Sequence, residues 1–442
     1  MRPMQAFHRK LPLFLMLLAL LVGSTGCVSM QHGLVDSFRD GGDFVRAYVV
    51  LEEAKSDLYT TKDKVLYHLN AGMLAHFAGM VNDSIAHLQE AERLIEENLT
   101  KSLSAEVGTF LVNDTVRDYA GEDYEDIYTN LFLALDQYRS GDIERMMVEL
   151  RRADNKLSEL ARKYEVPLRK ASAASGEPAM VSLRFLNSAL IHYLSLLGYR
   201  ALGKSDDVRF DTQRIYDAFN TQPAMYPFKL PSSVKEEASL TKDGTARVNF
   251  LVFSGKSPEK VSEVVRISIA DGHYVKLALP KMQYRYSPIS AVRVVFDDGK
   301  IVPLELIEDM GAVATETFRL NYAFIRAKTI IRATAKSLAG VVADASSRNE
   351  SNDSSDEAVA AWLKAFSLFM QVFQEVSEVP DLRMSRYFPS LAFVGGISLP
   401  TGNYSMRIEY LSSQGKILYT EQVGSILAEA GRLNLVEGVC PF

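Results

Sequence analysis

The feature that most constrains the fold of this chain is a spacing that recurs after three glycines in its first half. A small or flexible residue, a large apolar residue and an alanine stand five, nine and twelve positions after each glycine. The three sets are Ala47, Leu51 and Ala54 after Gly42, Ser84, Leu88 and Ala91 after Gly79, and Met146, Leu150 and Ala153 after Gly141. Residues three and four apart share one face of a helix, so each set predicts a helix that packs against a neighbour.

A partner helix is predicted on the other side of the turn. Residues 65–78 precede the second glycine and residues 124–139 the third. Residues 181–202 precede a fourth glycine, Gly203, after which the spacing is poorer. Helix pairs joined by a glycine turn are typical of tetratricopeptide-like repeats. The uneven intervals between the glycines indicate degenerate repeats with insertions, and a helical bundle without repeats is the alternative.

The pattern changes after residue 222, where prolines end the helical region and short β-prone runs begin. These runs cover 246–253, 264–269, 274–279, 292–296, 392–398, 404–410 and 417–422. Between the two groups of runs, 316–342 and 357–379 have helical patterns and are joined by a polar segment. We therefore expect an α+β protein. A tetratricopeptide-like α-helical repeat domain over 27–222 is followed by a β-rich domain over 223–442, with the helical hairpin inserted at about 316–379.

The N-terminal residues have the pattern of a targeting signal. Three basic residues precede an apolar run over 11–22, which is too short to span a bilayer as a helix. Small residues follow, and the run ends in Thr25-Gly26-Cys27. This ending resembles a bacterial lipobox, which implies a signal peptide over 1–26 and acylation of Cys27, with palmitate among the chains. An ordinary signal peptide with an incidental cysteine is the alternative. Lipidation would leave Cys440 without a partner.

Several function classes are not expected from this sequence. The net charge of −6 argues against nucleic-acid binding. No histidine pair has metal-ligand spacing, and there is no G-x-S-x-G motif. Residues 198–205 fit the phosphate-loop pattern, but a predicted helix rather than a strand precedes them, and Gly203 falls at a repeat turn. We expect no catalytic residue, no metal site and no cofactor.

An acidic run, 122–126, is the first candidate for partner binding. It opens a predicted helix, where the helix dipole favours negative charge. Glu122 and Glu125 are its candidate residues, with Arg151 and Arg152 of the paired helix as their counterparts. We favour a helix cap with internal ion pairs, and a polar groove for a partner is the alternative.

An aromatic stripe in the predicted hairpin is the second candidate. Its residues, spaced as on one helix face, are Trp362, Phe366, Phe369 and Phe373. The first hairpin helix carries a basic stripe of Lys328, Arg332 and Lys336. A helix that is apolar almost all round is normally buried, so we favour packing against the sheet. Contact with a second copy or with a membrane stays open.

The order of several motifs resembles a family of bacterial lipoproteins with tetratricopeptide-like repeats, grouped near curli-secretion-type lipoproteins. The motifs lie at 119–125, 148–156, 250–258, 332–336, 381–383 and 399–404. A tryptophan that the family has after its Asp-x-Arg motif is Ser385 here. The family has no assigned reaction, so the resemblance implies no catalytic residue.

We therefore expect a lipid-anchored outer-membrane protein, facing the periplasm, that acts as a protein-interaction scaffold. Its partners would be envelope proteins, with curli-secretion-type lipoproteins among the candidates, and a homo-oligomer stays open. The alternative is an envelope enzyme, or the activator of one, that acts on peptidoglycan or glycans.

Overall fold

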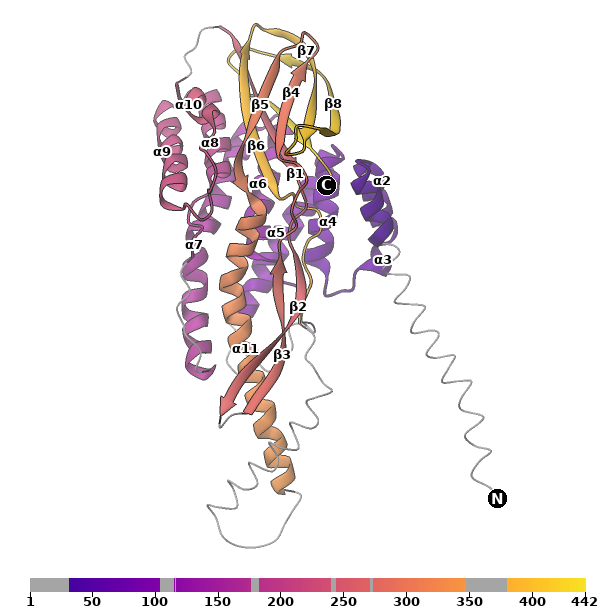
Figure 1. Ribbon diagram of the computed structural model, residues 1–442, viewed down its shortest axis with the longest axis vertical. Helices are drawn as coiled ribbons and strands as arrows, with labels where there is room; N and C mark the ends of the chain where they lie inside the picture. The colour runs from indigo at the N-terminus through magenta and orange to yellow at the C-terminus, as the bar shows by residue number, and fades with distance from the viewer. Residues whose placement is uncertain are drawn as a thin grey trace, which may run out of the picture.

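The computed structural model describes residues 32–103, 115, 117–175, 183–239, 244–270, 273–346 and 380–442. Cys27 and the aromatic stripe of Trp362, Phe366, Phe369 and Phe373 lie outside these residues. The described chain is α+β, as predicted. A helical region comes first, and a mixed seven-stranded sheet with one long helix follows (Figure 1).

The helical region begins with a helix over 32–40 and continues as helical hairpins. Its further helices are α2 (Phe44–Glu53), α3 (Lys55–Leu58), α4 (Lys64–Phe77), α5 (Val81–Leu103), α6 (Asp123–Arg139), α7 (Ile143–Ser175), α8 (Ala189–Ala201), α9 (Ser205–Thr221) and α10 (Ser232–Ser239). Helices α4 and α5, α6 and α7, and α8 and α9 pack as neighbouring pairs. The nine residues of the repeated spacing are all buried, which confirms the predicted helix faces.

The four predicted glycine turns share one geometry. Gly42, Gly79, Gly141 and Gly203 have φ of 81°, 73°, 81° and 73°, a region that side chains disfavour. At each turn the glycine N–H and the next N–H donate back to the last turn of the preceding helix, which satisfies its terminal carbonyls. Gly203 thus follows a helix, α8, whereas a phosphate loop follows a strand.

The seven-stranded sheet curls into a nearly closed barrel. Its strands are β1 (Ala246–Ser254), β4 (Ala291–Phe296), β5 (Ile301–Asp309), β6 (Leu391–Leu399), β7 (Gly402–Leu411), β8 (Ile417–Ala428) and β9 (Asn434–Val439). They lie in the order β8-β7-β4-β5-β6-β1-β9, and only β1 and β9 pair in parallel. At the seam between the two edge strands, Glu421 Oε2 of β8 accepts the N–H of Val439 of β9 at 2.9 Å.

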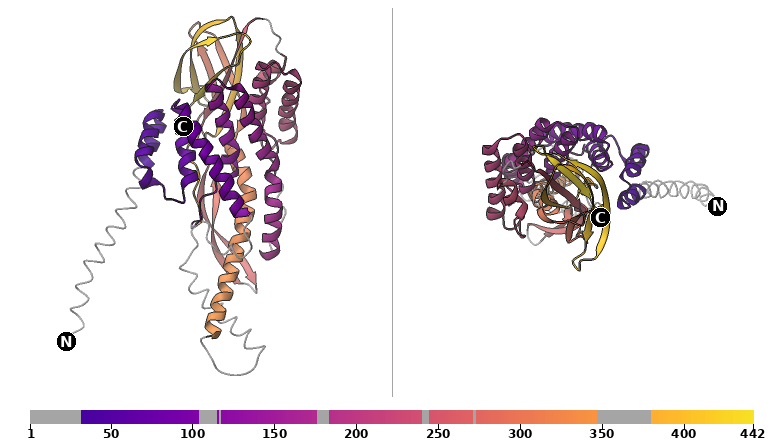
Figure 2. Two further views of the ribbon diagram at one scale, coloured as in Figure 1. Left: turned by 180° about the vertical axis from the view of Figure 1, so that it is seen from behind. Right: turned by 90° about the horizontal axis from the view of Figure 1, so that it is seen from above.

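Strand β1 is buried on both faces, which joins the sheet to the helices. Side chains alternate across a strand. Phe250 and its even-numbered neighbours lie in the barrel core, whereas Leu251 and Phe253 lie in the core that the helices form. Phe253 packs against Phe132 of α6, with ring centroids 5.2 Å apart. Seen along the long axis, the helices form an arc around the sheet (Figure 2).

A two-stranded ribbon and a long helix extend away from the barrel. The ribbon is β2 (Glu259–Ala270) with β3 (His273–Gln283), and the helix is α11 (Met310–Ser346) (Figure 1). Leu277 and Leu279 of the ribbon pack on α11. The strands predicted at 264–269 and 274–279 therefore pair with each other and not with the main sheet. Helix α11 is the first helix of the predicted hairpin, and the second, 357–379, lies outside the described residues.

Candidate functional site

The predicted helix cap is present at the start of α6. Glu122 is the N-cap residue, and Glu125 Oε2 accepts the backbone N–H of Glu122 at 2.8 Å. This reciprocal arrangement satisfies N–H groups that a helix N-terminus otherwise leaves unpaired. The negative charge also lies where the helix dipole favours it.

The cation that pairs with Glu122 is not one of the expected arginines. It is Lys260 of β2, which also donates to the carbonyl oxygen of Arg383 at 3.0 Å. Asn321 of α11 donates to the second carboxylate oxygen of Glu122 at 3.3 Å. Burial alone would lower the pKa of Lys260, but the carboxylates of Glu122, Asp381 and Glu125 together more than offset this and raise it. The ion pair therefore joins the start of α6 to the ribbon.

The two arginines lie instead on the exposed surface of α7. Arg152 pairs with Glu92 of α5 at 3.0 Å and with Glu149 of its own helix at 3.5 Å. Arg151 is exposed. The reason for the difference is position: Arg151 and Arg152 lie within α7, whereas Glu122 faces the ribbon and α11.

Glu125 is fully buried, and donors occupy both of its oxygens. Besides the N–H of Glu122, Oε2 accepts the hydroxyl of Tyr119 at 2.8 Å, and Oε1 accepts the N–H of Ser385 at 2.6 Å. Burial, reinforced by the Glu122 charge, raises the pKa of Glu125 to about 7. Such a pKa would suit a general acid or base, but the side chain is 0% exposed and enclosed by this chain's own groups.

The segment that begins at residue 380 contributes to the same site. Arg383 pairs with Asp381 at 2.7 Å and with Asp63 at 3.1 Å. Ser385, where the resembled family has tryptophan, donates its hydroxyl to Asn70 of α4 at 3.0 Å. The motifs at 119–125 and 381–383 thus meet in space. We refer to Glu122, Glu125, Lys260, Arg383 and Ser385 together as the α6 clamp.

A second buried bridge joins α4 and α6 to the sheet. His76 lies between two carboxylates, Nδ1 at 2.8 Å from Asp136 and Nε2 at 2.7 Å from Glu437 of β9. Arg139 adds a contact of 3.1 Å to Glu437. Although burial opposes the charged form, the two carboxylates raise the pKa of His76.

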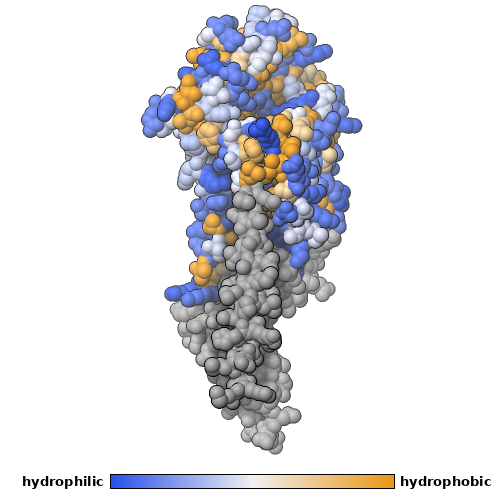
Figure 3. Space-filling model, turned by 90° about the vertical axis from the view of Figure 1, so that its right-hand side faces the viewer, coloured by the Kyte–Doolittle hydropathy of each residue, from blue (hydrophilic) through white to orange (hydrophobic). Residues whose placement is uncertain are grey.

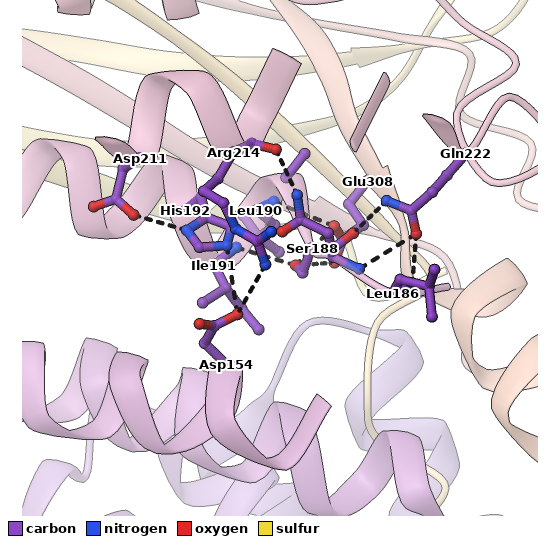
Figure 4. A network of polar contacts seen from close by, with 12 residues as sticks. Asp154, Leu186, Ser188, Leu190, Ile191, His192, Asp211, Arg214, Gln222 and Glu308 are labelled. Atoms are coloured by element: carbon purple, nitrogen blue, oxygen red, sulfur yellow. Dashed lines mark hydrogen bonds and ion pairs between the residues drawn. The ribbon is translucent and has the colours of Figure 1, made fainter. Parts of the chain in front are cut away.

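A third network surrounds Glu308 at the end of β5 (Figure 4). This carboxylate accepts the hydroxyls of Tyr128 at 2.7 Å, Ser188 at 2.8 Å and Tyr226 at 2.8 Å, and the N–H of Leu190 at 3.2 Å. Every one of these donors is neutral. Burial raises the pKa of Glu308, although the hydrogen bonds oppose this shift.

His192 lies beside this network on α8. Its Nδ1 is 2.7 Å from Asp211 of α9 and its Nε2 is 3.4 Å from Asp154 of α7 (Figure 4). The contacts tie together three neighbouring helices. Burial alone would lower the pKa of His192, but the two aspartates outweigh burial and raise it.

The residues that sequence reasoning missed share one signal. Lys260, Glu308 and Glu437 are charged residues that each stand next to an apolar residue in a strand, and all three side chains are largely or fully buried. Such a residue is costly to bury unless it is paired, so its position indicates a partner. The sequence does not indicate which partner, because each one lies far away along the chain.

Neither a metal centre nor a membrane span is found in the described part of the chain. No group of three or more His, Cys, Asp or Glu side chains among those residues could hold a metal ion. No helix within the same residues has the length and apolar character needed to cross a membrane.

The site is therefore a set of buried polar bridges between the helices and the β-rich part. In comparisons with known proteins, no family model, no curated protein and no solved structure matches this chain. The family resemblance drawn from the motifs accordingly stays a prediction.

Proposed function

We propose that this chain is a lipid-anchored lipoprotein of the bacterial envelope, on the periplasmic side of the outer membrane, that acts as a scaffold for other envelope proteins. Cys27 would carry the lipid. The observation that supports the scaffold role best is the shared core of helices and sheet, bridged by the buried Glu122–Lys260 and His76–Glu437 pairs. A framework held in this way keeps its exposed surfaces at fixed distances from one another.

We also propose that the helical region is tetratricopeptide-like. The four identical glycine turns and the buried repeated positions support this description. Repeats of this kind usually bind partners on their concave face. Here the sheet lies inside the arc of helices (Figure 2), and Phe253 and Phe388 pack against Phe132 of α6, so that face is occupied by this chain. We therefore place partner binding on the outer surface, foremost on the ribbon, where Val264 is 64% exposed.

An envelope enzyme, or the activator of one, acting on peptidoglycan or glycans is the second candidate. The pKa of Glu125 near neutrality is the observation that favours it. The scaffold is the better-supported proposal, because all the groups around Glu125 are structural donors and its side chain is buried.

Site-specific photo-cross-linking in growing cells tests the scaffold proposal. A photoreactive residue at Val264 of the ribbon is compared with one at Ile301, which is 54% exposed on the barrel. We expect the same envelope protein to be cross-linked at Val264 in repeated captures, and not at Ile301. A cross-link to a second copy would make the partner this chain itself.

The enzyme alternative needs its own measurement. Purified protein is incubated with peptidoglycan and with envelope glycans, and released fragments are measured by mass spectrometry. Fragment release by wild type, reduced in Glu125→Gln, would overturn the scaffold proposal. A defined cross-linked partner without fragment release is the result we expect.

A further inference from the structure

The first helical hairpin has an apolar face on its outer side as well as on its inner side. On the inner side, Val35 of the helix over 32–40 and Ala47 and Leu51 of α2 are buried. On the outer side, Leu34, Val45 and Val49 are 48%, 51% and 43% exposed. We call these three residues the N-terminal patch.

The patch is not an ordinary solvent-facing helix surface. Exposed helix faces are usually charged, and helices that are apolar on two faces are usually covered on both. The exposed residues next to Leu34 on the first helix, Gly33 and Ser37, are also uncharged, and the exposed charged residues of the hairpin, Arg46 and Glu53, lie on α2. Apolar residues gather on the side of the molecule that carries α2 (Figure 3).

The position of Cys27 in the sequence indicates what covers the N-terminal patch. Only residues 28–31 separate it from His32, where the first helix begins. Five steps of extended chain reach at most about 18 Å. The ten residues of α2 add a length of about 15 Å. A lipid on Cys27 therefore keeps the whole first hairpin within reach of the headgroup region.

We propose that the N-terminal patch lies on the surface of the bilayer that holds the anchor. This inference rests on the proposed lipidation of Cys27. The acyl chains provide the affinity, and the patch sets the orientation of the molecule, because Leu34, Val45 and Val49 can enter only the boundary between headgroups and acyl chains. Arg46, exposed on the same helix, suits anionic headgroups, although Asp43 lies 3.5 Å from it.

Depth-dependent fluorescence quenching tests this orientation on the mature, acylated protein. A fluorophore is attached at Ser37→Cys, beside the patch, and the control carries it at Ile301→Cys on the barrel. Cys440 does not interfere, because burial raises the pKa of its thiol to about 12. The vesicles contain phosphatidylethanolamine, phosphatidylglycerol and a lipid with a quencher near the headgroup.

We expect loss of fluorescence and a blue-shifted emission at Ser37→Cys, with neither change at Ile301→Cys. Replacing Leu34, Val45 and Val49 together by serine should abolish the quenching while the protein still floats with the vesicles. Because these side chains are only about half buried, that variant should still unfold cooperatively with a small drop in melting temperature, which excludes misfolding as the cause.

Other outcomes separate the possible failures. Vesicle-bound protein without quenching at Ser37→Cys, or with equal quenching at both positions, would overturn the patch orientation. A blue shift without quenching would point to a second copy on the patch and would also overturn it. Wild-type protein that does not float with vesicles would mean that the lipid anchor, and with it the proposed function, is wrong.

Discussion

Two buried carboxylates in this molecule are neutralised in opposite ways. Glu122 in the α6 clamp has a cation, Lys260, whereas Glu308 has only neutral donors from Tyr128, Ser188, Tyr226 and Leu190. Both join the helical region to the β-rich part. A buried ion pair depends strongly on both partners, because removal of one leaves an unpaired charge. A carboxylate held by neutral donors can instead keep a proton. Burial raises the pKa of both carboxylates, so the cation beside Glu122 is what distinguishes the two sites.

The largest effect is expected when the cation of the clamp is removed. Lys260→Met leaves Glu122 buried without its counter-charge, and we expect a loss of ~3–5 kcal/mol in the free energy of unfolding. Urea unfolding followed by circular dichroism measures this loss. Lys281→Met is the matched control, since Lys281 forms an exposed pair with Glu263 on the same ribbon. A loss no larger than that of the control would mean that the α6 clamp contributes little to the free energy of unfolding.

Stability should depend on pH through the carboxylates that lack a cation. Glu421 at the barrel seam accepts the hydroxyl of Tyr410 and the N–H of Val439, and burial raises its pKa to about 7. Between its unfolded pKa and about 7, the folded state holds a proton that the unfolded state has released. Stability is therefore lost as pH rises through this window, by up to about 3 kcal/mol for a shift of this size.

The comparison that isolates this effect is wild type against Glu421→Gln, whose amide cannot ionise. From pH 5 to pH 8, wild type should lose stability relative to the variant. Parallel pH profiles of the two proteins in thermal unfolding would show that Glu421 does not titrate in the folded state. His76 and His192, whose pKa values are also raised, contribute the same sign but are common to both proteins.

A smaller effect is expected when Glu308 is made neutral. Glu308→Gln keeps the shape of the side chain but replaces one acceptor oxygen by a donor, which faces the hydroxyls of Tyr128, Ser188 and Tyr226. We expect a loss of ~1–3 kcal/mol, below that of Lys260→Met. Glu305→Gln on the same strand is the control. A loss equal to or above that of Lys260→Met would remove the distinction between the two carboxylates.

Structural features formed by residues close together in the sequence were predicted correctly. Contacts between residues far apart in the sequence were missed. The cap formed by Glu122 and Glu125 and the glycine turns follow from spacings of one to a few residues, and both are present. Lys260 lies 138 residues from Glu122, and Glu437 lies 361 residues from His76. Local patterns contain no information on such pairs. For the same reason, the alternation in β2 and β3 predicted strands but not that they form a separate ribbon.

The smallest effect on stability is expected at the Gly203 turn. This turn has no buried charge, so it gives a reference against which the losses at the buried carboxylates can be compared. Gly203 has φ 73° and no atom within 4 Å of an added side chain, so Gly203→Ala meets backbone strain alone. We expect a loss of ~1–2 kcal/mol, the usual cost of a side chain in the left-handed region. Lys204→Ala beside it should leave the free energy of unfolding unchanged, because Lys204 is exposed.

Calorimetric titration with ATP and magnesium should detect no binding to wild type, to Gly203→Ala or to Lys204→Ala. Micromolar binding to wild type that Lys204→Ala abolishes would instead make residues 198–205 a phosphate site and contradict their assignment as a helix turn.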